Sequence, residues 1–210
     1  TYLFVGRIAY FNQAFDCLWN NAGFKCGTRP TKNGKLFYMR KYIRNYVEGG
    51  TYFFTMVTKN RKPLFQDPSL CYFFMAGVEK IKSRYPFDLD AYVILPDHIH
   101  LLISLPAGMR DYSNIIKEVK KSVTKEIRKH LDQPDLVVWQ DRFWEHTIRD
   151  ERDMKTHYDY IHYNPVKHGY VESADQWKWS SIDGDSRKME IESSLEQIKI
   201  MNQQGYSFGE

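Results

Sequence analysis

Two strand-like runs separated by one turn constrain the fold of this 210-residue chain more than any other feature. The runs are FDLDAYVILP at 87–96 and HIHLLISLP at 98–106, and both are rich in apolar residues. Short runs of this kind, divided by proline and aspartate, predict two strands that meet as a hairpin at Pro96–Asp97. Strands joined by so tight a turn pair antiparallel, so the sheet contains at least one antiparallel pair.

Segments with strand and helix periods alternate around this hairpin. Aromatic and β-branched runs at 49–60 and 143–150 predict two more strands. Helical spacing of apolar residues predicts helices over 67–86, 111–131 and 150–165, the last ended by Asn164–Pro165. The order β-α-β-β-α-β-α favours an α+β fold of ferredoxin-like or RRM-like type, an antiparallel or mixed sheet with helices packed on one face.

Three parts of different composition are expected along the chain. Residues 1–38 show no steady period and hold five basic side chains against one acidic one, so we expect a poorly structured extension outside the native domain. Residues 39–182 contain the periodic segments and form the expected compact domain. Residues 183–210 hold six acidic and three basic side chains, which indicates a charged C-terminal tail.

Composition argues against a membrane-spanning protein and against a disulfide framework. No apolar run is long enough to cross a bilayer. The three cysteines, Cys17, Cys26 and Cys71, are odd in number and irregularly spaced. Cys17 and Cys26 could pair or form half of a zinc site, but free thiols in a reducing cytoplasm are favoured. The net charge of +4 is modest, so any argument for a nucleic-acid partner depends on local patches.

The second run of the hairpin carries two histidines one residue apart. In a strand, residues two apart point to the same face, so His98 and His100 project together while Ile99 points to the core. Two imidazoles at this separation can converge on one divalent metal. The alternative is a pair on a solvated sheet face. Two rival motifs do not fit: a histidine triad needs a third histidine where Leu102 stands, and a two-histidine phosphoesterase needs H-x-Ser/Thr twice.

The third predicted helix adds a phenol and an amide. Tyr160 and Asn164 are four residues apart and share a helix face. An amide oxygen is a hard donor that suits Mg²⁺ or Mn²⁺. The alternative is that Tyr158, Tyr160 and Tyr163 pack the helix onto the sheet, and that Asn164 only ends the helix before Pro165.

Taken together, these motifs resemble a known family. The strings LPDHIHLLISLP, VVWQDRFWEHTIRD and HYDYIHYNPVKHGYV are similar to the REP-associated tyrosine transposases, members of the HUH single-tyrosine superfamily. The resemblance implies a histidine pair on a central strand, with a divalent metal, Mg²⁺ or Mn²⁺, on His98, His100 and Asn164. More distant HUH transposases have glutamine at the position of Asn164. The nucleophile falls on Tyr160.

The resemblance also implies a substrate and a reaction. The substrate is single-stranded DNA with a hairpin from repetitive extragenic palindromes, and the protein is bacterial, cytoplasmic and nucleoid-associated. Attack by Tyr160 on a phosphodiester gives a 5′-phosphotyrosine and a free 3′-hydroxyl, which a later 3′-hydroxyl can reverse. The general base is open, with His157 and His162 as candidates.

Basic residues suggest where DNA binds. Five of them form a stripe on the second predicted helix, and others lie near the strands or follow the nucleophile; the predicted DNA-binding residues are Lys117, Lys120, Lys121, Lys125, Arg128, Arg61, Arg142, Lys167 and His168. The alternative for the stripe is an ordinary solvated helix face.

Two other functions stay open: a hairpin nucleic-acid-binding module that does not cut, and a metal-dependent phosphodiesterase. The protein could act as a monomer or a homodimer. The charged tail is a candidate brake that folds over the site.

Overall fold

The computed structural model describes residues 28–30, 36–38, 44–182 and 208–209. By its contacts the chain divides into two compact units, residues 1–44 and 45–210. In the first unit, β1 (Thr28–Pro30) pairs antiparallel with β2 (Leu36–Tyr38), a short hairpin that the sequence did not predict. The domain boundaries near residues 38 and 182 stay predictions, and most of the N-terminal extension and of the charged tail lies outside the described residues.

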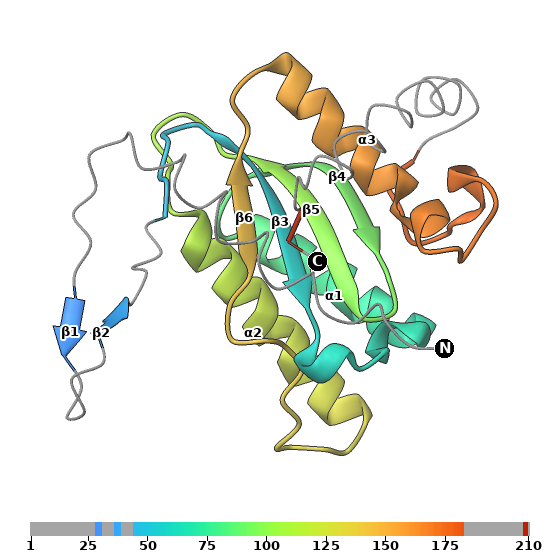
Figure 1. Ribbon diagram of the computed structural model, residues 1–210. Helices are drawn as coiled ribbons and strands as arrows, with labels where there is room; N and C mark the ends of the chain where they lie inside the picture. The colour runs from blue at the N-terminus through green and yellow to red at the C-terminus, as the bar shows by residue number, and fades with distance from the viewer. Residues whose placement is uncertain (1–27, 31–35, 39–43, 183–207, 210) are drawn as a thin grey trace, which may run out of the picture. The chain divides into compact units, whose positions relative to one another are not determined.

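The second unit follows the predicted order of elements. They are β3 (Thr51–Val57), α1 (Pro68–Lys82), β4 (Asp88–Ile94), β5 (His98–Ser104), α2 (Tyr112–His130), β6 (Trp144–Thr147) and α3 (Glu151–Lys167). The strands form one antiparallel sheet in the order β4-β5-β3-β6 (Figure 1). The hairpin prediction is confirmed, since β4 and β5 are paired neighbours across Pro96–Asp97. The split β-α-β units and this strand order confirm the α+β, ferredoxin-like class.

Helices cover both faces of the sheet, which corrects the expectation of one covered face. Tyr52, Phe54 and Met56 of β3 pack into the larger core with α1 and α2. Phe53 of the same strand points the other way and packs with Tyr160 of α3. Because alternate side chains of a strand face opposite sides, an almost uninterrupted apolar run needs cover on both. Figure 1 shows α3 on one side of the sheet and α1 and α2 on the other.

Capping residues set where the helices begin. Asp67, Asp111 and Asp150 each accept a hydrogen bond from a backbone N–H in the first turn of α1, α2 and α3. The predicted end of the third helix at Asn164–Pro165 is wrong, because α3 continues to Lys167. Proline removes one N–H, but the N–H of His168 still reaches the carbonyl of Asn164, so the last turn closes.

None of the helices that the structure describes combines the length and the apolar character needed to span a membrane.

Candidate active site

Both histidines of the H-x-H motif lie on β5, an inner strand of the sheet, and face α3. His98 and His100 are 1% and 0% exposed, and their ring centroids lie 5.0 Å apart. Ile99 between them belongs to the core under α1 and α2. The alternative of a solvated sheet face is therefore wrong. Buried polar rings need partners, so the neighbours of each imidazole decide what it can do.

Asp97 orients the ring of His98. Its Oδ1 accepts a hydrogen bond from His98 Nδ1 at 2.7 Å, and its Oδ2 accepts one from Arg61 Nη1 at 2.9 Å. Burial alone raises the pKa of Asp97, but the hydrogen bonds from His98 and Arg61 outweigh burial, so this pKa lies below its usual range. The ionised carboxylate holds the proton of His98 on Nδ1, and Nε2 is then the nitrogen with the lone pair.

Thr55 sets the tautomer of His100 in the same way. The Thr55 hydroxyl donates to the carbonyl oxygen of Phe208 at 2.6 Å, and its oxygen lies 2.9 Å from His100 Nδ1. A hydroxyl has one proton, so the Thr55 oxygen accepts from His100 Nδ1. Nε2 of His100 then carries the lone pair, which agrees with the Asn164 Nδ2 group placed 3.2 Å from it.

The nucleophile predicted from sequence lies beside this pair. The Tyr160 ring centroid is 5.4 Å from that of His100, and the Asn164 amide contacts His100 Nε2. Both side chains are buried on the face of α3 that covers β5. The structure thus brings together the four residues that the sequence assigned to one site, His98, His100, Tyr160 and Asn164.

The donor set fits a divalent metal. Both imidazoles have an oxygen partner at Nδ1, the arrangement that metal-ligating histidines use. Asn164 now directs Nδ2 at His100, and turning its amide over presents the oxygen instead. His98, His100 and Asn164 therefore offer a mixed nitrogen and oxygen donor set that fits a divalent metal ion.

Two further groups contact Tyr160. Lys167 Nζ donates to the Tyr160 oxygen at 2.9 Å. Phe208, near the end of the chain, stacks on the Tyr160 ring with centroids 3.6 Å apart and an angle of 11° between planes. Phe208 is buried against Phe53 and His157 as well. The sequence did not identify Phe208, which lies 48 positions beyond Tyr160 and has no motif around it.

A second cluster that the sequence missed joins β6 to the start of α3. Among the described residues, His146, Asp153 and His157 offer nitrogen and oxygen atoms within 4.8 Å of one another. Asp153 Oδ2 already accepts from His146 Nε2 at 2.8 Å and from Arg149 Nε at 3.0 Å. Burial would raise the pKa of Asp153, but these hydrogen bonds lower it to about 2. Because the Asp153 carboxylate already bonds the Arg149 guanidinium and His146, we interpret it as an anchor between β6 and α3 and not as a metal ligand.

The candidate general bases are both engaged in structural hydrogen bonds. Burial lowers the pKa of His157 to about 4, and its Nδ1 bonds the carbonyl of Asp153 at 2.8 Å. His162 bonds the Tyr158 carbonyl through Nδ1 and Ser181 Oγ through Nε2, each at 2.9 Å. These contacts favour positioning of α3 over proton transfer by either ring.

The predicted DNA-binding residues divide between the two faces of the sheet. Arg61 bonds Asp97, the His168 ring lies 5.1 Å from that of His98, and Lys167 contacts Tyr160, so these three line the candidate active site. The stripe on α2 lies under the opposite face, where Lys120 bonds the Gln140 carbonyl. Arg142 is exposed ahead of β6.

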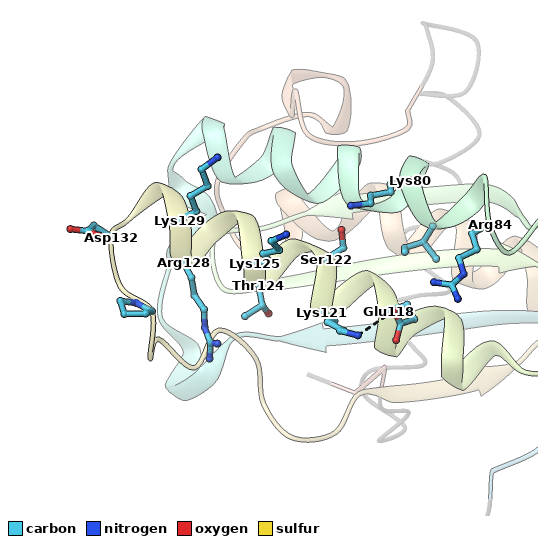
Figure 2. A pocket seen from close by; sticks show the side chains of 12 residues that line it. Lys80, Arg84, Glu118, Lys121, Ser122, Thr124, Lys125, Arg128, Lys129 and Asp132 are labelled. Atoms are coloured by element: carbon cyan, nitrogen blue, oxygen red, sulfur yellow. Dashed lines mark ion pairs between the residues drawn. The ribbon is translucent and has the colours of Figure 1, made fainter.

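Part of that stripe lines a groove between α1 and α2. We call it the α1–α2 groove, and Figure 2 shows long basic side chains along it. Arg128 also bonds the Leu136 carbonyl at 2.9 Å, and Lys121 lies 3.8 Å from Glu118. The sequence found only the α2 side, because no pattern within one helix indicates which neighbour faces it. The basic residues of the groove are Lys80, Arg84, Lys121, Lys125, Arg128 and Lys129.

The known proteins that are similar to this chain include transposases. Residues 46–164 match the family described as Transposase IS200 like. A Haemophilus influenzae protein assigned as a REP-associated tyrosine transposase is 41% identical over 155 residues, covering 70% of this chain and 88% of that protein. The REP-associated tyrosine transposase of Escherichia coli is 37% identical over 147 residues, covering 70% and 85%.

Among solved structures, a REP-associated tyrosine transposase bound to a REP hairpin matches with a TM-score of 0.61 and 38% identity. The match covers 69% of this chain and 83% of that one. These similarities confirm the resemblance drawn from the sequence motifs, and the chain belongs to the IS200-like transposase family.

Proposed function

We propose that this transposase nicks and rejoins single-stranded DNA beside a hairpin of REP type, with Tyr160 as the nucleophile. The observation that carries the proposal is the meeting of a phenol with a paired-imidazole and amide set, the Tyr160 ring lying 5.4 Å from that of His100. The relative of known structure binds a REP hairpin, which supports the same class of DNA here. Binding alone does not require a buried tyrosine beside two oriented histidines.

The chemistry follows from the residues. A phenol has a pKa of about 10 in water, so it is a poor nucleophile near neutral pH unless the phosphate is activated. A divalent ion held by His98, His100 and Asn164 would supply Lewis-acid activation of that phosphate. Asp97 and Thr55 keep both imidazoles in the ligating tautomer. The product keeps its phosphoester bond as a 5′-phosphotyrosine, so a 3′-hydroxyl can later rejoin the strand.

The DNA is held on two surfaces. Arg61 and His168 border the histidine pair, which supports a role for both in holding the backbone next to the scissile phosphate. The α1–α2 groove lies on the opposite face and supplies clustered positive charge for a duplex stem. Tyr160 and the histidines come from one chain, which supports action of the tyrosine in cis, by a monomer or by each copy of a dimer.

Covalent trapping tests the proposal. Labelled single-stranded hairpin DNA is incubated with the protein and Mn²⁺ and then separated on a denaturing gel. We expect a labelled protein band that disappears in Tyr160→Phe and persists in the matched controls Tyr158→Phe and Tyr163→Phe. An adduct on either control residue would refute the choice of nucleophile.

The same gel separates the two alternative functions. Cleavage without an adduct would indicate a phosphodiesterase, and intact DNA that still binds would indicate a binding module.

A further inference from the structure

Lys167, the last residue of α3, holds the oxygen atom of Tyr160. Its Nζ donates to that oxygen at 2.9 Å and lies 4.9 Å from the centroid of the same ring. Tyr160 is fully buried whereas Lys167 is exposed, so the ammonium group reaches inward from the surface. An ammonium group only donates hydrogen bonds, so the phenol oxygen is the acceptor.

This contact depends on the continuation of α3 through Pro165. Seven residues separate Tyr160 from Lys167, nearly two full turns, so both lie on one face of the helix. A lysine in a last turn also interacts favourably with the helix dipole. The dipole does not explain the observed geometry, because it attracts the charge toward the backbone carbonyls and not toward the Tyr160 side chain.

We propose that Lys167 is a catalytic residue whose ammonium group offsets negative charge on the Tyr160 oxygen. The inference rests on the proposed function, because it takes Tyr160 as the nucleophile. A charged donor already aligned on the reacting atom stabilises that atom most when it carries charge. Holding the DNA backbone, the role predicted from sequence, would use the same ammonium group at a different atom.

Both half-reactions place charge on this oxygen. In cleavage the phenolic proton passes to water, the bond from the Tyr160 oxygen to phosphorus forms, and the bond from phosphorus to O3′ breaks. O3′ then takes a proton from water. In rejoining, the 3′-hydroxyl gives its proton to water, O3′ bonds phosphorus, and the tyrosine leaves as a phenolate that water reprotonates. Lys167 keeps its own protons in both directions.

The two roles considered for Lys167, DNA binding and charge stabilisation, predict different effects of its replacement on affinity and on rate. A lysine that only binds the DNA backbone affects the dissociation constant and its salt dependence. A lysine that offsets charge on the Tyr160 oxygen affects the rate of the chemical step with DNA at saturation. We expect Lys167→Met to slow single-turnover cleavage and rejoining about 10- to 100-fold at saturating DNA. Lys178→Met, which removes one exposed positive charge elsewhere, is the matched control.

Fluorinated tyrosine at position 160 separates chemistry from structure. A difluorotyrosine is a better leaving group, so it depends less on a charge partner. In rejoining from purified adduct, the ratio of rates between the native chain and Lys167→Met should shrink several-fold when the adduct carries difluorotyrosine. A merely structural lysine leaves this ratio unchanged. Because each ratio compares the same two lysine backgrounds, any loss of stability cancels.

The outcomes distinguish this inference from the function beneath it. An adduct that survives Tyr160→Phe overturns the proposed function. Loss of the adduct in Tyr160→Phe, with Lys167→Met as fast as Lys178→Met, overturns the role of Lys167 and leaves the function standing. Partial retention of the rate in Lys167→Arg, which keeps the charge, supports the inference. A ratio of native to Lys167→Met rejoining rates that does not change with fluorination refutes it.

Discussion

Replacing Phe208 tests whether the end of the chain restrains the enzyme. Phe208 is 3% exposed and stacks on Tyr160, whose own exposed fraction is 0%. Burial of a phenylalanine side chain contributes about 1.5–3 kcal/mol. Aromatic stacking adds about 0.5–1.5 kcal/mol. Removing the ring therefore weakens docking of residues 208–209 by roughly 2–4 kcal/mol. Each 1.4 kcal/mol changes the ratio of docked to undocked molecules about tenfold.

Since DNA must reach a tyrosine that Phe208 covers, the docked segment and the substrate compete. We expect Phe208→Ala to accelerate adduct formation about 10- to 100-fold at subsaturating DNA, because the gain ends once the open form dominates. The assay is single-turnover cleavage of hairpin DNA with Mn²⁺ over a range of DNA concentrations, and the acceleration should vanish at saturation. Phe208→Leu, which keeps apolar burial without stacking, should give an intermediate rate. Slower cleavage by Phe208→Ala at every concentration would show that Phe208 helps to build the working site.

Three further predictions concern pH, DNA affinity and the metal. Burial holds the pKa of His157 at about 4, below about 6.5 in the unfolded chain, so protons bind the unfolded state first. The free energy of unfolding should then fall by roughly 2–3 kcal/mol as the pH drops from about 6.5 to about 4. Urea titrations should show a smaller fall in the free energy of unfolding over this pH range in His157→Gln. Changing Lys121, Lys125 and Arg128 to Gln should reduce the slope of log affinity against log salt by about 2–3, without altering the rate at saturating DNA. An unchanged slope would place the hairpin elsewhere. His98→Ala should abolish both cleavage and the calorimetric Mn²⁺ isotherm, and an isotherm of full strength would assign the ion to other ligands.

Patterns among residues close in sequence predicted much of the fold and part of the site. The turn at Pro96–Asp97 and the order of strand and helix periods sufficed for the antiparallel α+β class, because each depends on neighbours in sequence. Spacing also paired His98 with His100 on a strand and Tyr160 with Asn164 on a helix, but the choice of these residues as ligands and nucleophile came from the resemblance to the transposase family. Strand and helix geometry alone places the members of each pair side by side.

Features that depend on distant residues were not predictable in the same way. Stacking of Phe208 on Tyr160 joins segments with no shared pattern. The helix was expected to end at Asn164–Pro165, since proline disfavours the helical conformation of the preceding residue, yet burial of Asn164 against β5 accompanies its continuation to Lys167. The FWEH and RDERD strings contain His146 and Asp153, but only the fold places β6 against the start of α3.

Because Tyr160 and Asn164 lie on one continuous helix, α3, their relative orientation is set by the helical repeat. Each residue advances the helix by about 1.5 Å and turns it by about 100°. One extra residue between Tyr160 and Asn164 would therefore put the phenol and the amide on different faces of α3. The same insertion ahead of Tyr160 would rotate them together, and their mutual spacing would survive.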